Sequence, residues 1–137
     1  MLSFTILIMA LTATSCATSD IKESGQVAIH EDARHVMETF QRITSGPETA
    51  NRSRLRSQLE AQLPSMYSLT WTPAGDFQAD VYLREHLTRG GGWFAEQRTV
   101  QACVRYTSRN GSPSMHSITC TDQAPLSGTV DEDVTVP

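Results

Sequence analysis

The sequence has little of what marks fibrous, metal-rich or membrane-embedded proteins. Three of its 137 residues are cysteine, 7% are aromatic, and no charge of one sign dominates, since the formal net charge is −4. This composition excludes collagen-like and coiled-coil chains, transmembrane bundles and cysteine-rich metal scaffolds. Because the balance is not basic, nothing predicts nucleic acid as a partner. The length suits a single domain.

The start of the chain has the pattern of a targeting segment. Residues 4–11 form an apolar run, which is followed by small residues and then by Cys16. The run is about half as long as a bilayer-spanning helix, so it predicts a cleaved signal peptide over residues 1–15. An ordinary signal peptide cut after Ala13 or Ala17, and an uncleaved anchor, are the alternatives.

Residues 13–16, Ala-Thr-Ser-Cys, resemble the lipobox of bacterial lipoproteins. In that family a cysteine follows the cleavage point and receives lipid, and the small residues before it give the peptidase room. Ala13 stands where the family usually has Leu, and no Lys or Arg precedes the apolar run. The resemblance implies that Cys16 is lipidated and that the protein is anchored in the cell membrane on its extracytoplasmic face.

The cysteine count supports this interpretation. If Cys16 carries lipid, Cys103 and Cys120 remain, and an even number outside the cytoplasm favours a disulfide. A bridge between them closes a loop of roughly 18 residues, which contributes about 3 kcal/mol on a chain-entropy argument.

Two helices are predicted after a polar tether over residues 16–25. Apolar residues then recur at intervals of three, four and seven, which predicts a helix with one apolar face that ends at residues 45–47. A weaker helix is predicted from Pro47 to Leu63, because proline suits a first helical turn and Pro64 ends the run. The stripe of the first helix comprises Ile29, Ala33, Val36, Met37, Phe40 and Ile43.

Beyond Pro64 the apolar period changes to two, which is typical of half-buried strands. Turn residues at 73–76, 90–92 and 110–111 separate four such segments. Short turns predict an antiparallel meander whose apolar face is covered by the first helix or by both. The four segments are residues 67–72, 77–84, 100–106 and 115–121.

The predicted fold class is therefore α+β, with one or two N-terminal helices packed on a four-stranded antiparallel meander sheet in one domain over residues 26–121. Residues 122–137 contain three consecutive acids, two prolines and few apolar residues, which predicts a disordered tail. In outline the fold resembles the cystatin-like and nuclear-transport-factor-like folds. Because those folds include enzymes, binders and assembly modules, the resemblance assigns no function.

Alternation leaves a conflict between the last two strands. Cys103 is on the polar side of its strand, whereas Cys120 shares a side with Ile118. Pairing the cysteines directly sets Ile118 opposite the polar-side Arg105. A slip of one residue brings Ile118 to the face of Val104 but separates the sulfurs. We favour the disulfide because the cysteine count supports it independently.

The motifs that carry catalysis are missing from the sequence. It has no phosphate loop, Gly-x-Ser-x-Gly, His-Glu-x-x-His or Cys-x-x-Cys. His30 and His35 lie about 140° apart on a helix and cannot share one ion. A constellation of His86, Asp80 and His116 is conceivable, but no spacing requires it. We predict no catalytic residue, no metal and no cofactor, and a protein that is not an enzyme.

The large aromatics of the strand region are most simply explained by packing. A sharper hypothesis is a concave sheet surface that binds a ligand or partner by stacking and charge, formed by Tyr82, Arg84, Trp93 and Arg105.

Three functions fit these observations. The leading hypothesis is a non-catalytic cell-envelope lipoprotein that presents a small binding or accessory domain to an envelope protein or cell-wall component. The second is a secreted small-ligand binder or weak enzyme with a helix–sheet pocket that includes Tyr82, Arg84 or His86. The third is a subunit of a secretion or conjugation assembly, which predicts a large interface and an unstable isolated chain.

Overall fold

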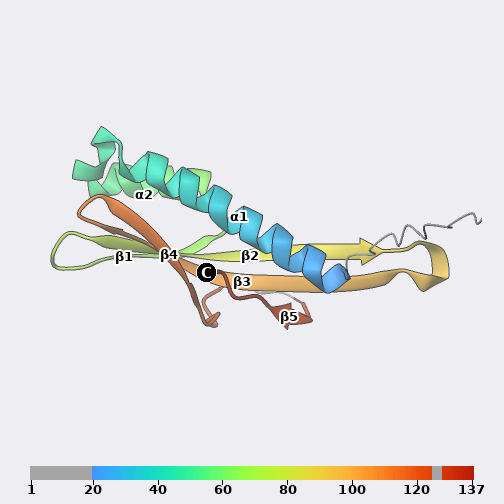
Figure 1. The fold of residues 1–137 in the computed structure, drawn as a ribbon. Helices are drawn as coiled ribbons and strands as arrows, with labels where there is room; N and C mark the ends of the chain where they lie inside the picture. Colours follow the sequence, from blue (N-terminus) through green and yellow to red (C-terminus); the bar gives the residue numbers. More distant parts are fainter. Residues whose placement is uncertain (1–19, 125–127) are drawn as a thin grey trace, which may run out of the picture.

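The computed structural model describes residues 20–124 and 128–137 (Figure 1). The expected signal peptide and Cys16 lie outside the described residues. In chain order the elements are α1 (Ile21–Thr44), the 3₁₀ turn η1 (Pro47–Ala50), α2 (Arg52–Gln62), β1 (Met66–Trp71), β2 (Phe77–Arg89), the 3₁₀ turn η2 (Gly92–Phe94), β3 (Glu96–Arg109), β4 (Ser112–Ile118) and β5 (Glu132–Asp133).

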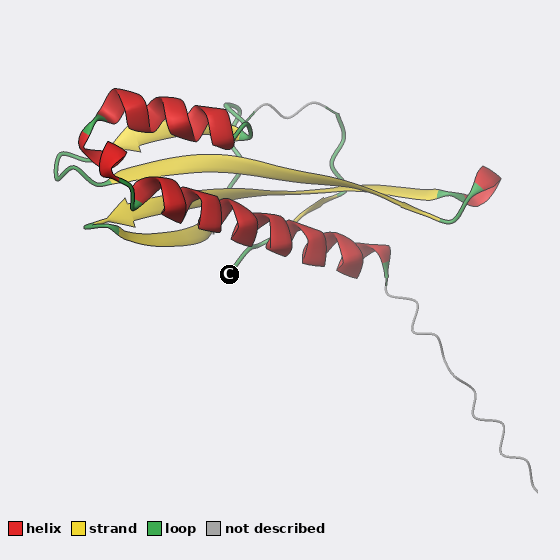
Figure 2. Cartoon of the chain, turned by 90° about the horizontal axis from the view of Figure 1, so that it is seen from above, coloured by secondary structure: helices red, strands yellow, loops and turns green. Residues whose placement is uncertain are grey.

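The first four strands form an antiparallel meander in the order β1-β2-β3-β4, which confirms the predicted α+β class. Asn110 and Gly111 form the tight turn between β3 and β4, with φ of 49° and 77°. β2 and β3 pair from Phe77 with Ser108 to Arg89 with Glu96. Because β1 and β4 are shorter, the far end of this hairpin projects beyond the rest of the sheet (Figures 1 and 2).

Both helices lie on one face of the sheet (Figure 1). Phe40 of α1 is fully buried, with its ring centroid 5.7 Å from that of Phe77 and 5.8 Å from that of Tyr106. The Tyr106 hydroxyl donates to the carbonyl oxygen of Ala33 at 3.0 Å. The alternating apolar residues of β2 and β3 thus form the inner face, as the period of two predicts.

The helix boundaries differ from the predictions. The Asp20 carboxylate accepts from the amide of Lys22, and α1 begins at Ile21, which is 4% exposed. The prediction of a tether to residue 25 is therefore wrong for residues 21–25. The predicted helix from Pro47 to Leu63 is divided, because Asn51 caps α2 by accepting from two backbone amides after the separate turn η1.

The C-terminal segment is not the disordered tail that its composition predicts. β5 pairs in parallel with β3, with Glu132 opposite Val100, and the Val134 amide donates to the Gln101 carbonyl at 2.7 Å. Val134 and Val136 join the core at 7% and 3% exposure. The segment can pair there because β4 stops pairing at Cys103. The backbone groups of β3 just before Cys103 are therefore left without a partner from β4.

The predicted disulfide between Cys103 and Cys120 is present, with a Cα–Cα distance of 5.2 Å. Neither expected register occurs. Cys103 lies opposite Ile118, and Arg105 lies opposite His116. Cys120 follows the end of β4, so the bridge fastens the chain just beyond the ladder instead of joining a cross-strand pair.

Candidate functional site

Arg105 and its neighbours lie on the outer face of the sheet, away from the helices. Arg105 on β3 is the cross-strand partner of Asp80 on β2, and it donates from Nε and Nη2 to the two carboxylate oxygens at 2.7 and 2.8 Å. This hydrogen bonding raises the pKa of Arg105 despite its partial burial. Asp80 is only 8% exposed. The guanidinium is therefore already matched by an internal carboxylate.

Arg84 and Tyr82 share this outer face. Arg84 Nη2 donates to Gln101 Oε1 at 3.3 Å, and Gln101 Nε2 donates to Asp133 Oδ1 at 2.8 Å. Tyr82 lies opposite Cys103 and is half-buried. Three of the four residues predicted to form a binding surface thus share one face, but Arg105 is bonded to Asp80, and Arg84 is bonded to Gln101, which in turn contacts Asp133 of β5.

Trp93 lies apart from the other three. It belongs to η2 at the tip of the β2–β3 hairpin, where Trp93 is 101% exposed and Phe94 is 93% exposed. Gly90 and Gly92 have φ of 80° and 65°, so the tip uses backbone conformations that favour glycine. Phe94 was not among the predicted site residues, although its place beside Trp93 after three glycines was visible in the sequence.

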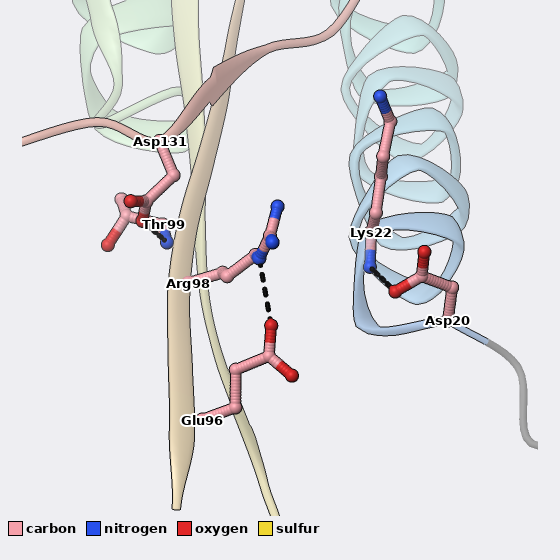
Figure 3. A network of polar contacts seen from close by, with 6 residues as sticks. All are labelled: Asp20, Lys22, Glu96, Arg98, Thr99 and Asp131. Carbon is pink, nitrogen blue, oxygen red and sulfur yellow. Dashed lines mark hydrogen bonds and ion pairs between the residues drawn. The ribbon is translucent and has the colours of Figure 1, made fainter.

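The tip and the start of α1 lie at the same end of the molecule (Figures 1 and 2). Gly25 of α1 packs against Leu87 of β2 and Val100 of β3, close to where the hairpin begins to project. Polar contacts order this end: Arg98 Nε donates to Glu96 Oε1 at 3.0 Å, and the Thr99 amide donates to Asp131 Oδ2 at 2.7 Å (Figure 3).

The histidines do not converge. His86 Nδ1 lies 2.9 Å from Thr99 Oγ1, and His30 Nε2 lies 3.0 Å from the Thr135 carbonyl. His116 is the cross-strand neighbour of Arg105, and His86 is about 20 Å along β2 from Asp80. Within residues 20–124 and 128–137, no group of three or more His, Cys, Asp or Glu residues has the geometry to hold a metal ion.

Two carboxyl groups meet between α1 and β2. Glu85 on the inner face of β2 hydrogen-bonds Asp32 of α1, and its pKa is raised by burial and by this neighbouring acid. The effect of Asp32 is electrostatic as well as through the hydrogen bond, because two carboxylates this close repel each other. Both residues are half-buried, and Glu85 is the acid of the described chain whose pKa is most clearly shifted.

The space between α1 and the sheet is filled by side chains. Ile29, Phe40 and Tyr106 are each 0% exposed there. One surface hollow of about 380 Å³ lies at the opposite end from the hairpin tip, where Thr44, Arg52 and Asp76 contribute to its lining. It does not include the residues proposed for a helix–sheet pocket.

In the described residues, no helix is both long and apolar enough to cross a membrane. Comparisons of the chain with models of protein families, with curated proteins and with solved structures find no match.

Proposed function

We propose that this chain is a cell-envelope lipoprotein, held at the extracytoplasmic face of a membrane by lipid on Cys16, that presents a small non-catalytic binding or accessory domain. The observation that carries the proposal is the pairing of Cys103 with Cys120. It leaves Cys16, the last of the lipobox-like residues 13–16, without a cysteine partner in the chain. A lipid acceptor explains this third cysteine.

The short distance from Cys16 to the folded domain supports the same proposal. α1 begins at Ile21, five residues after Cys16. Five residues reach at most about 18 Å. A lipid on Cys16 therefore keeps the domain against the membrane surface and orients the end that carries the α1 start toward it.

The charged residues of the outer sheet face give no support to a ligand surface that binds through their charges, because they are engaged within the domain. Arg105 is neutralised by Asp80, and Arg84 is engaged with Gln101. The filled helix–sheet interior offers no support to the alternative of a small-ligand binder or weak enzyme with a pocket beside Tyr82. A partner at the envelope, whether a protein or a cell-wall component, would then contact the surface of the domain.

The test is the intact mass of the protein recovered from bacterial membranes, before and after reduction. We expect a chain that starts at Cys16, carries the added mass of lipid and gains two hydrogens on reduction. Cys16→Ser should release the protein from the membrane fraction, whereas the matched control Cys103→Ser with Cys120→Ser should stay attached. An unlipidated wild-type chain, or a Cys16→Ser variant that remains membrane-bound, would refute the proposal.

A further inference from the structure

We infer that the tip of the β2–β3 hairpin is a second membrane contact, in which Trp93 and Phe94 enter the lipid headgroup region beside the lipid-bearing N-terminus. The inference rests on the proposed attachment through Cys16 and adds to it a surface of the folded domain.

The tip of the hairpin exposes two large apolar side chains. Trp93 and Phe94 are 101% and 93% exposed, and they are adjacent at the outermost point of the hairpin. Folded proteins bury most of such aromatic area, and an exposed apolar group at a projecting tip marks a contact with a partner or membrane. Tryptophan is enriched at membrane interfaces, because its ring is apolar and its indole N–H stays hydrogen-bonded.

The distance by which the tip extends beyond the start of α1 follows from the register of the hairpin. Gly25 packs at the level of Leu87 and Val100. From this level the hairpin ladder continues for two residues on β2 (from Leu87) and four on β3 (from Val100) to the pair of Arg89 with Glu96, and the tip turn follows. With rises of about 3.3 Å per strand residue and 1.5 Å per helical residue, the tip extends roughly 10 Å beyond the start of α1.

The five residues from Cys16 to Ile21 reach up to about 18 Å, which exceeds this projection. The lipid on Cys16 and the two aromatic side chains therefore reach the same plane. An N-terminus that emerged at the opposite end, near the β3–β4 turn, would have held the tip away from the membrane.

The charged residues around the tip indicate which kind of membrane surface it contacts. Residues 89–98 contain three charged side chains, Arg89, Glu96 and Arg98, and the last two form an ion pair with a 3.0 Å separation. This described hairpin segment holds no cluster of lysine or arginine that would select anionic lipids. The contact is therefore apolar, and we expect little dependence on salt or on the fraction of anionic lipid.

Tryptophan fluorescence tests the inference directly, since Trp71 is the only other tryptophan. The lipidated protein is placed in vesicles of phosphatidylethanolamine and phosphatidylglycerol that contain brominated phospholipid. Trp71→Phe leaves Trp93 as the reporter, and its emission should shift to the blue and be quenched. The matched control Trp93→Phe leaves Trp71, which packs under Arg52 and Arg56 near the other end and should not be quenched.

A second measurement separates the tip from the lipid. The unlipidated Cys16→Ser chain is titrated with plain vesicles, and Phe94→Ser should lower its partition coefficient by about tenfold. Val27→Ser, at an exposed apolar residue of α1 away from the tip, should leave it unchanged. Both substituted side chains are exposed, so folding is preserved.

The outcomes of these experiments are distinguishable. A chain without lipid in the mass measurement refutes the proposed anchor, while the Phe94→Ser titration still tests the tip. Unquenched Trp93 in the anchored protein, or a partition coefficient that Phe94→Ser does not change, overturns the membrane contact. Shielding of Trp93 only after envelope proteins are added also overturns it and identifies a protein partner instead.

Discussion

Asp80 and Arg105 face each other across β2 and β3 on the side of the sheet opposite α1 and α2, joined by two hydrogen bonds of 2.7 and 2.8 Å. Their side chains are 10% and 32% exposed. This ion pair lies on the outer face of the sheet, beside Cys103 and the segment that is held by the disulfide. It gives the outer face a fixed arrangement and takes Arg105 away from ligand binding.

Removal of one member of this pair should destabilise the fold. Arg105→Met leaves the buried Asp80 carboxylate uncompensated and should lower the free energy of unfolding by about 2 kcal/mol in urea titrations. Arg98→Met is the control, because its pair with Glu96 is 40% and 48% exposed and should contribute under about 0.5 kcal/mol. Equal effects of the two substitutions would contradict this account.

The disulfide should stabilise the protein because it closes a loop and so restricts the unfolded chain. The double substitution Cys103→Ala with Cys120→Ala should lower the free energy of unfolding by about 3 kcal/mol, since the bridge spans a sequence separation of 17. Hydrogen exchange should also become faster at the Val134 amide, which bonds the Gln101 carbonyl. Unchanged exchange there would mean that β5 holds its place without the bridge.

The acid pair should make stability depend on pH. Glu85 has a pKa raised above its ordinary value of 4.5, by burial and by Asp32. The folded state therefore holds this proton more tightly than the unfolded state. The contribution of Glu85 to the free energy of unfolding is fully present below pH 4.5. It is lost as the pH rises through the raised pKa that Glu85 has in the folded state.

Glu85→Gln mimics the protonated acid and removes the repulsion at all pH values. Thermal unfolding should show little difference from the parent in acid and a more stable variant at neutral pH. Glu38→Gln, at an exposed position of α1, should show no such divergence with pH. A Glu85→Gln variant that is less stable than the parent at pH 7 would argue against the pair.

Gly25 should be required where α1 approaches the sheet most closely. A Cβ there would lie 2.6 Å from Leu87 Cδ1 and 3.0 Å from Val100 Cγ2. Gly25→Ala should therefore lower the free energy of unfolding by about 1 kcal/mol, although alanine is the better helix former. Ser24→Ala, on the exposed side of the same turn, should be neutral or stabilising. A Gly25→Ala variant that is more stable than the parent would show that the Leu87 and Val100 side chains move aside at little cost.

Much of the fold could be predicted because local signals agreed with one another. The stripe from Ile29 to Ile43 had one period, the strands had another, and Asn110-Gly111 had the chemistry of a tight turn. The candidate site was less predictable. Alternation placed Tyr82, Arg84 and Arg105 on one face, but it did not indicate that Asp80 and Gln101 would engage the two cations, or that Trp93 would stand alone at a projecting tip.

The amino-acid sequence by itself determined the order and faces of the elements, the single meander, the cysteine pair and the lipobox-like start, because each depends on neighbours along the chain. Only the tertiary structure decided the register of β4, the place of β5 and the end at which α1 begins. Val134 and Val136 are too few to predict a buried segment; they are buried because β4 stops short and leaves an open edge of β3. Such choices depend on contacts between residues far apart in the chain, which no local pattern records.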